Sequence, residues 1–520
     1  MSATAEHVRP MPQVNPWLIA ATVISATFME VLDTSVANVS LPHIAGNLSA
    51  SVDESTWVLT SYLVSNAIVL PLTGWFSTLF GRKRLFIACV SIFTVSSFLC
   101  GMAPSLSALV FFRVVQGAGG GGMQPISQAI LVDSFPREKQ GIAMAIYGMG
   151  VVVAPTLGPT LGGWITDNYS WRWIFLLNVP VGIVSLAMIS LLISDPVHLI
   201  RKTFKQGLRI DFLGLGLLSV GLGFLQVVLD KGERDDWFGS TFITWATVVA
   251  VASLFALVIR ELTAKDPVVD LHLFKDRNFA ISTFMMYTLG VVLYGTTLLL
   301  PIWLQTLMGY TAMESGLVLL PGGLVLLACL PFVGLMLDRF QPRWIVALGL
   351  LIMATGLFEL SHLNLSASPR APVSDWIISR MGTAFLFVPI NVMAFYFVPR
   401  GKMNNASGLI NLARNVGAST GISFVTTMLD RRAQFHQNVL SEFLQAGNRH
   451  YQAALHRITS FLAAHGDSMA RASTGAHALV YQQLQQQSMM LSFVDNFRIM
   501  GTICLCVLPL LFLMRQKARQ

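Results

Sequence analysis

The feature that most constrains the fold of this chain is a series of long apolar stretches. Fourteen of them reach about twenty residues, the length that a helix needs to cross a hydrocarbon core about 30 Å thick. Only 12% of the 520 residues are charged and 54% are hydrophobic, whereas a soluble domain has roughly 25% charged residues. We therefore predict an all-α integral membrane protein with 14 transmembrane helices. The stretches begin near Trp17, Trp57, Leu85, Leu106, Ile142, Trp173, Phe212, Phe242, Phe279, Ser315, Trp344, Trp376, Ser407 and Leu491.

The lysine and arginine residues predict how these helices are oriented. Every second connection is basic, and cytoplasmic loops carry an excess of Lys and Arg. The short connections on the other side hold only Arg172, Lys231, Arg234 and Arg370. Since the number of helices is even, we predict that both termini are cytoplasmic. The net charge of +8 thus reflects topology and gives no indication of nucleic-acid binding. The basic connections are 82–84, 137–139, 201–209, 260–277, 339–343, 400–402 and 515–519.

Several other classes of function are disfavoured by the sequence. The five cysteines lie in apolar runs without the spacing of metal ligands, so we expect no metal site. The glycine run Gly117–Pro125 lacks the flanking strand and the Lys-Ser/Thr pair of a phosphate-binding loop, so we expect no nucleotide cofactor. Its small residues favour close helix packing instead. No combination of a nucleophile and a base indicates an enzyme.

An internal repeat divides the chain. The segment "GWFSTLFGRKRLF" (74–86) is similar to "GLMLDRFQPRWIV" (334–346), and "RVVQGAGGGGMQPI" (113–126) is similar to "RMGTAFLFVPI" (380–390). Parallel repeats of this kind occur in secondary transporters, whose binding site lies between the halves near the bilayer midplane. We predict a cytoplasmic tail at 1–16, a six-helix half at 17–200, two inserted helices at 201–270 and a second six-helix half at 271–520.

The second half contains a long polar segment at 430–489. The spacing of Phe435, Val439, Phe443 and Leu444 indicates an amphipathic helix. We therefore predict an ordered helical segment in the periplasm, and the alternative is a flexible loop.

Two carboxylates, Glu30 and Asp33, interrupt the first apolar stretch. Acids are costly inside a bilayer, and a spacing of three residues places both on one helix face. Such a pair titrates as a coupled unit. We predict that both residues carry protons. The alternatives are that Asp33 bonds a neighbouring helix or lies in the wet interface.

The motifs of the chain resemble those of the major facilitator superfamily, in its fourteen-span drug:proton antiporter branch of the EmrB/QacA type. "VLDTSVANVSLP" resembles the first-span signature, and "WRWIFLLNVPVG" (171–182) is typical of the branch. Three further motifs match through residues in the second to fifth spans. These are Gly74, Gly81, Arg82 and Lys83 in "GWFSTLFGRKR"; Arg113, Gln116 and Gly117 in "LVFFRVVQG"; and Gly150, Pro155, Gly158, Pro159, Gly162 and Gly163 in "GMGVVVAPTLGPTLGGW".

This resemblance implies proton-coupled efflux of amphipathic toxic compounds by alternating access. It implies that Arg113 tunes the protonation of a nearby acid, although a purely structural salt bridge is the alternative. The fifth-span glycines and prolines would seal the protein against proton leak. The loop motif usually has an aspartate where this chain has Thr78, while its second copy keeps Asp338 and Arg339. The first gate is therefore either weaker or dependent on helix-end and hydroxyl bonding.

Arg380 and Arg414 look similar to Arg113. If they lie near helix ends, their long side chains can snorkel to the interface, and neither arginine then needs a functional role.

Small-molecule sites combine apolar and aromatic walls with a few polar groups. Polar and aromatic residues near the predicted midplane are candidates for the substrate cavity, and Trp57 and Tyr62 are further aromatic candidates. The candidates are Asn38, Gln116, Gln128, Tyr147, Tyr287, Tyr294 and Asn391.

The resemblance to Gram-negative pumps of this type also implies a multi-pass protein of the inner membrane. Its partners would be a periplasmic adaptor (a membrane fusion protein) and an outer-membrane channel. One alternative is a dedicated exporter of a single metabolite or fatty acid. The other is a membrane scaffold or sensor that transports nothing.

Overall fold

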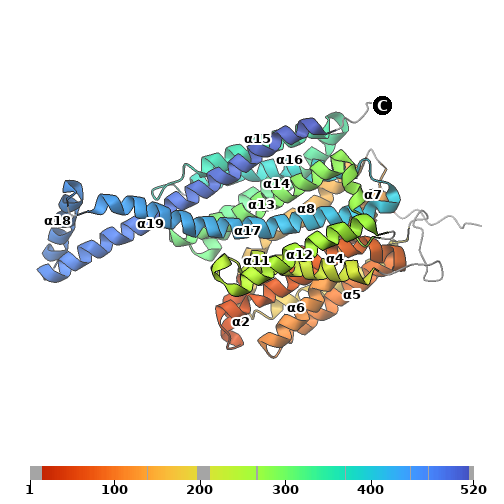
Figure 1. Cartoon of the computed structure of the whole chain (residues 1–520), viewed down its shortest axis with the longest axis horizontal. Helices are drawn as coiled ribbons and strands as arrows, with labels where there is room; N and C mark the ends of the chain where they lie inside the picture. The colour runs from red at the N-terminus through yellow and green to blue at the C-terminus, as the bar shows by residue number, and fades with distance from the viewer. Residues whose placement is uncertain are drawn as a thin grey trace, which may run out of the picture.

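The computed structural model describes residues 15–136, 139–195, 211–264, 267–368, 370–445, 447–465 and 468–514. Within these ranges every regular element is a helix, and the long helices run side by side (Figure 1). Of the described helices, 11 are long and apolar enough to cross a membrane. The chain is therefore an all-α, multi-pass membrane protein, as predicted from the sequence. The total of 14 spans stays a prediction.

The N-terminal half consists of the helices before residue 195. A helix, or a pair of helices in line, begins at or near each of the first six predicted starts. The fourth is divided into two helices because Gly121 and Gly122 interrupt it, and glycine is a poor helix former. The elements are α1 (Pro16–Val39), α2 (Leu41–Asn47), α3 (Val52–Ser55), α4 (Trp57–Phe80), α5 (Arg82–Gly101), α6 (Leu106–Gly120), α7 (Met123–Ser134), α8 (Gln140–Asn168), α9 (Trp173–Leu176) and α10 (Asn178–Leu192).

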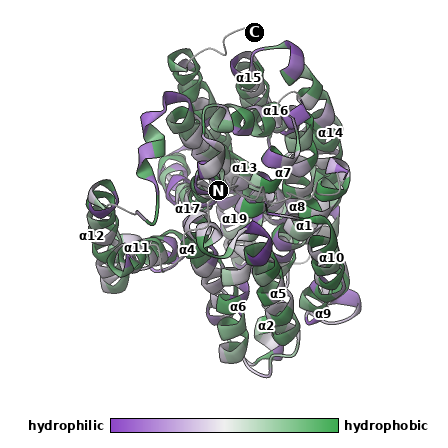
Figure 2. Cartoon of the chain, turned by 90° about the vertical axis from the view of Figure 1, so that its right-hand side faces the viewer, coloured by the Kyte–Doolittle hydropathy of each residue, from purple (hydrophilic) through white to green (hydrophobic). Residues whose placement is uncertain are grey.

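Two helices, α11 (Phe212–Lys231) and α12 (Thr241–Thr263), form a hairpin between the halves in sequence, with the short 3-10 helix η3 (Trp237–Gly239) at its turn. The hairpin stands at the edge of the bundle beside α4 (Figure 2). Asp211 holds the two helices together, because it caps α11 through the Gly214 N–H at 2.9 Å and accepts from Arg260 Nε at 2.9 Å.

The C-terminal half consists of the helices after residue 270. Its helices α13 and α17 pack along each other, as do α15 and α16. The elements are η4 (Leu271–Lys275), α13 (Arg277–Thr306), α14 (Ala312–Arg339), α15 (Pro342–Leu360), α16 (Arg370–Phe395), η5 (Arg400–Lys402), α17 (Met403–Ser441), η6 (Glu442–Leu444), α18 (Arg449–Ala464), α19 (Met469–Val507) and η7 (Leu508–Leu513).

Helices α17 and α19 are unusually long. Each has 39 residues, and together they carry α18 beyond the rest of the bundle, at the far left of Figure 1. Asp495 joins them, because its Oδ2 lies 2.6 Å from Arg432 Nη2 and 2.7 Å from His436 Nε2. Most of the described residues of 430–489 lie in α17, η6, α18 and α19, and their location in the periplasm stays a prediction.

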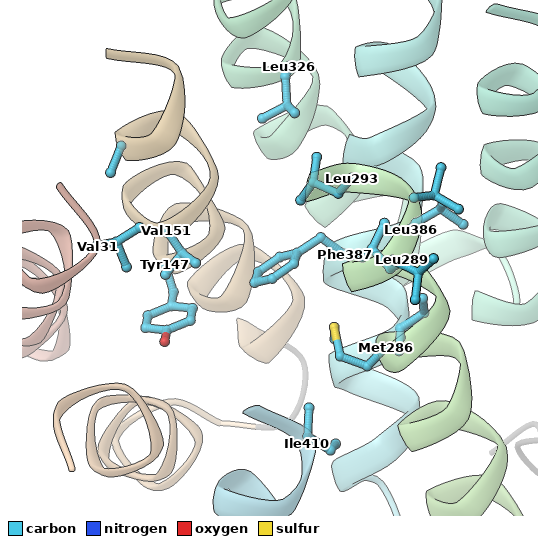
Figure 3. Close-up of a cluster of buried hydrophobic side chains, with 14 of the residues drawn as sticks. Val31, Tyr147, Val151, Met286, Leu289, Leu293, Leu326, Leu386, Phe387 and Ile410 are labelled. Carbon is cyan, nitrogen blue, oxygen red and sulfur yellow. The ribbon is translucent and has the colours of Figure 1, made fainter. Parts of the chain in front are cut away.

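The two halves meet closely at one end of the bundle, which we term the basic end. It is the end where α4 passes into α5 at Gly81 and where α8 and α17 begin. Backbones approach each other there, since a Cβ on Gly408 would lie 2.7 Å from the carbonyl oxygen of Leu70, and one on Gly141 would lie 3.0 Å from that of Gly334. Deeper in the bundle, the ring of Phe387 reaches from α16 towards α8, where Tyr147 and Val151 lie (Figure 3).

Candidate functional site

A buried ion pair joins α1 to α6. Arg113 Nη1 lies 2.6 Å from Asp33 Oδ2, and the arginine side chain is 0% exposed. The guanidinium also donates to the carbonyl of Val58 at 2.9 Å and to Gln116 Oε1 at 2.8 Å. A buried charge needs a partner of opposite sign, and Asp33 is the carboxylate partner that the position of Arg113 required.

Aromatic rings enclose this arginine. Its guanidinium carbon lies 4.2 Å from the centroid of Tyr62 and 5.6 Å from that of Phe175. A cation over an aromatic face is attracted by the ring quadrupole, more strongly where water is excluded. The rings therefore hold the guanidinium in place beside Asp33.

Asp33 accepts two further hydrogen bonds, both at Oδ1. The donors are Gln116 Nε2 at 3.1 Å and Asn178 Nδ2 at 2.6 Å. Asn178 also donates to Ser97 Oγ at 3.0 Å. Asn178 was absent from the sequence-based candidates, although it is the polar residue inside the apolar part of the "WRWIFLLNVPVG" motif. Together with Arg113, these donors place three N–H groups on the two oxygens of Asp33.

Glu30 lies one turn before Asp33 on α1 and has a separate set of donors. These are Gln124 Nε2 at 2.6 Å, Tyr62 Oη at 3.2 Å and Asn66 Nδ2 at 3.2 Å. Tyr62 thus belongs to both sites, since its hydroxyl donates to Glu30 while its ring packs on Arg113. The two carboxylates are therefore coupled through Tyr62.

Two of the donors of Glu30 also form hydrogen bonds with the C-terminal half. Gln124 Oε1 accepts a hydrogen bond from Arg414 Nη2, and Asn66 Oδ1 accepts from Asn415 Nδ2 at 3.2 Å. Arg414 is buried inside α17, as Arg380 is inside α16. The expectation that these two arginines snorkel at helix ends is wrong, because each lies about ten residues into its helix.

Hydrogen bonds continue from this point along the contact between the halves, which we term the seam. Gln128 Oε1 accepts from Ser407 Oγ at 2.6 Å and from Asn411 Nδ2 at 2.8 Å. Nearer the basic end, Asn404 Nδ2 donates to Ser77 Oγ at 2.5 Å. In the described part of the chain, the side-chain hydrogen bonds between the halves all lie from the level of Glu30 towards the basic end.

The predicted cavity residues lie in different places. Gln116 belongs to the Asp33 site, Gln128 belongs to the seam, and Tyr294 lies one turn after Gly290, whose backbone packs against Arg414. Tyr147 is buried near the seam (Figure 3). The remaining three are elsewhere: Asn38 is exposed near the end of α1, Tyr287 stacks on Phe284, and Asn391 donates to the Phe387 carbonyl of its own helix at 2.8 Å.

The residues of the first loop motif form a compact junction at the basic end. Gly81 has a φ of 82°, which favours glycine, and it lets α5 begin directly after α4. Arg82 is buried and pairs with Asp133 at the end of α7. Lys83 Nζ donates to the Ser190 carbonyl at 2.6 Å. In contrast, Asp338 and Arg339 of the second copy are exposed.

Thr78 occupies the place of the motif's usual aspartate, and a neighbouring residue makes the contact between the halves. Thr78 Oγ1 donates to the Trp75 carbonyl of its own helix at 2.7 Å and does not bridge the halves in the structure. Its neighbour Ser77 accepts the hydrogen bond from Asn404 instead. One turn earlier on α4, Asn405 approaches Gly74 so closely that a Cβ on Gly74 would lie 1.3 Å from the Oδ1 atom of Asn405. The contact between the halves at this end thus contains a hydrogen bond between an amide and a hydroxyl.

The fifth-span motif packs α8 against α1. A Cβ on Gly150 would lie 2.9 Å from Ile24, one on Gly158 would lie 2.1 Å from Ser35 Oγ, and one on Gly162 would lie 3.0 Å from Val36. Ser35 Oγ donates to the Pro155 carbonyl at 3.1 Å. Gly163 differs, since a Cβ there would meet nothing within 4 Å. The side chain of Pro159 lies outside the described residues.

Similarity to known proteins shows the family of the chain. Residues 23–422 match the model of the Major Facilitator Superfamily. The chain is 35% identical to the multidrug export protein EmrB of Escherichia coli over 509 residues, covering 98% of this chain and 97% of that protein. It is also 35% identical to the fatty acid resistance protein FarB of Neisseria gonorrhoeae over 489 residues, covering 94% of each.

A solved structure supports the fold. The proton:xylose symporter XylE superimposes with a TM-score of 0.62 at 14% identity, covering 96% of each chain. At this identity the likeness concerns the fold alone. The assignment made from the sequence motifs is confirmed by the family match and by the full-length relatives. This chain belongs to the major facilitator superfamily, in the branch that contains EmrB.

Proposed function

We propose that the protein is a proton-coupled exporter of amphipathic toxic compounds. The observation that carries this proposal is the buried polar path from the Asp33–Arg113 pair through Tyr62 and Glu30 to Arg414. It links groups that can hold a proton to the contact between the two halves. The printed name of the Escherichia coli relative, a multidrug export protein, supports the type of substrate.

In the proposed mechanism, ionised Glu30 holds the seam closed. Its negative charge orients Gln124, whose oxygen then faces Arg414 across the seam. A proton added to a carboxylate oxygen of Glu30 removes that charge and weakens the link, so the halves can separate at the basic end. Release of the proton on that side restores the charge and allows substrate to be carried the other way.

Asp33 would complete the coupling. Its charge balances Arg113, and protonation would leave a buried guanidinium that favours a rearrangement of α6 against α1. One proton moved through 100 mV supplies about 2.3 kcal/mol, which sustains roughly 50-fold accumulation of a neutral substrate. A modest membrane potential would therefore suffice for efflux.

The proposed topology places the basic end in the cytoplasm and α18 in the periplasm. The distribution of Lys and Arg supports this orientation. The chain would then consist of a tail at 1–16, halves at 17–200 and 271–520 and inserted helices at 201–270. In this orientation the seam is closed on the cytoplasmic side, and we propose an inner-membrane location with α18 available to a periplasmic adaptor that contacts an outer-membrane channel.

A second candidate is an exporter dedicated to one metabolite or fatty acid. The printed name of the Neisseria gonorrhoeae relative, a fatty acid resistance protein, favours it. Resistance that is limited to a single class of compound, when the gene is expressed in a sensitive host, would support this candidate over a multidrug exporter.

The test is substrate-driven proton release from proteoliposomes that contain a pH-sensitive dye. We expect Asp33→Asn and Glu30→Gln to abolish release driven by a lipophilic cation such as ethidium, while Glu359→Gln, which alters an exposed carboxylate, matches the wild type. Full substrate-driven release by Asp33→Asn would refute the role assigned to Asp33.

A further inference from the structure

Arg380 is a buried arginine that the proposed proton path does not use. Its side chain is 5% exposed in the interior of α16. Nη2 donates to Thr297 Oγ1 at 2.7 Å and lies 3.5 Å from Thr296 Oγ1. The guanidinium carbon lies 3.6 Å from the centroid of the Trp376 ring.

No negative charge balances this guanidinium in the part of the chain that the structure describes. The groups that face it from α13 are two hydroxyls. Each donates a hydrogen bond to the backbone carbonyl one turn earlier in its own helix, Thr297 to Leu293 at 2.6 Å and Thr296 to Val292 at 2.7 Å. Arg380 Nε is buried without a hydrogen-bond partner. A buried, unbalanced guanidinium is costly inside a membrane protein and indicates a functional site.

The internal repeat shows what Arg380 lacks. Arg113 and Arg380 occupy equivalent places in the repeated segments 113–126 and 380–390. Arg113 pairs with a carboxylate of α1, the first long helix of its half. Arg380 meets Thr297 of α13, the first long helix of the other half. The repeat therefore keeps the arginine and replaces the carboxylate with hydroxyls.

Thr297 places this arginine next to the seam. It follows Tyr294 by three residues on α13, so the two share one face of the helix and are separated by about 4.5 Å along its axis. Gly290, one turn before Tyr294 on the same side of α13, packs against α17, since a Cβ there would lie 2.4 Å from the Arg414 carbonyl oxygen. Arg414 in turn bonds Gln124 of the N-terminal half. Both residues are partly exposed, although Gly295 and Thr296 between them are buried.

We propose that Arg380 and Thr297 bind the acidic headgroup of anionic amphiphiles, with a carboxylate as the headgroup. A guanidinium presents parallel N–H groups that match the two oxygens of a carboxylate, and the unused Nε provides one of them. A ligand would supply the charge that Asp33 supplies to Arg113. This inference rests on the proposed function, because it names a substrate class for the same exporter.

Binding of decanoate to purified protein tests the site independently of transport. Decanol is the matched ligand, since it has the same chain without the carboxylate. We expect wild-type protein to bind decanoate more tightly than decanol, and Arg380→Gln to lose about ten-fold of that preference, the usual worth of a charged hydrogen bond. Arg498→Gln, which removes an exposed arginine of α19, should keep it.

A second variant supplies the missing charge from the protein itself. Thr297→Asp recreates beside Arg380 the pairing seen at Arg113, so it should fold and yet lose the preference for decanoate. Equal binding of decanoate and decanol by the wild type would overturn the proposal. So would an unchanged preference in both Arg380→Gln and Thr297→Asp.

Transport measurements then separate this inference from the proposed function. In proteoliposomes, Arg380→Gln should reduce decanoate-driven proton release at least five times more than ethidium-driven release. If the wild type releases no protons with either compound but binds decanoate through Arg380, the proposed function fails and the anion site stands. If Arg380→Gln reduces both activities equally, the anion site fails and the exporter stands.

Discussion

Glu30 of α1 and Arg414 of α17 are linked through one side chain, that of Gln124. The amide nitrogen of Gln124 donates to Glu30 Oε2 at 2.6 Å, and its oxygen accepts from Arg414. An amide can serve both partners at once only in this orientation. Glu30 and Arg414 together therefore determine which group of Gln124 faces the C-terminal half.

Replacing this bridge should open the seam at the basic end. Gln124→Leu removes both hydrogen bonds, which leaves Arg414 and Glu30 without their shared partner. We expect spin labels at Phe80 and Phe397, both exposed near the basic end, to show a larger population of long distances than in the wild type. Gln483→Leu, on the exposed face of α19, is the control. An unchanged distance distribution in Gln124→Leu would show that the bridge does not hold the seam.

Asn178 should stabilise the Asp33 site measurably. Asn178→Leu removes the donor 2.6 Å from Asp33 Oδ1, and loss of a hydrogen bond to a buried charge costs about 1–3 kcal/mol. We expect a lower unfolding temperature in detergent and weaker proton coupling. Asn168→Leu, at an exposed asparagine at the end of α8, should change neither property. A stability equal to the wild type would contradict the role of Asn178.

The contact between α8 and α1 should tolerate no side chain at Gly158. A Cβ there would lie 2.1 Å from Ser35 Oγ and 3.1 Å from the backbone carbon of Ser35. Overpacking of this kind costs about 1–3 kcal/mol, so Gly158→Ala should lower the unfolding temperature. Gly163→Ala is the matched control on the same helix, because nothing lies within 4 Å of its Cβ. Removing the hydroxyl with Ser35→Ala should restore part of the stability of Gly158→Ala.

The stabilisation that Asp211 gives to the inserted hairpin, as the N-cap of α11, should depend on pH. Burial by itself would raise the pKa of Asp211, but the hydrogen bonds from Arg260 and from the Gly214 backbone outweigh burial and lower that pKa. A lowered pKa means that the stabilisation is complete above the unfolded-state value near 4 and is lost as the pH falls through the folded-state value.

We therefore expect Asp211→Ala to cost about 1 kcal/mol at pH 7, as for other helix caps. The difference in unfolding temperature between this variant and the wild type should shrink as the pH is lowered from 5 to 3. Asp235→Ala, in the turn at the other end of the hairpin, is the comparison. A difference that stays constant over this range would exclude a contribution from the charge of Asp211.

The sequence by itself determined the positions of 11 long apolar helices, the family that the chain belongs to and the acids that are unusual. Hydropathy and motif spacing are local properties, so α1 and the Glu30–Asp33 pair could be predicted from a short window. The break between α6 and α7 is also local, but the glycine run was interpreted as a packing surface and the interruption at Gly121 and Gly122 was not predicted.

Only the tertiary structure decided which residues meet. The partners of Asp33 lie 80 and 145 residues away in Arg113 and Asn178, and Gln124 meets Arg414 across 290 residues. Lipid is as apolar as the helix surfaces, so hydropathy does not determine which faces pack together. Close contacts between small residues and hydrogen bonds between buried polar side chains make that choice. For the same reason, the sequence showed that Arg380 exists and the structure showed that hydroxyls face it where Arg113 has a carboxylate.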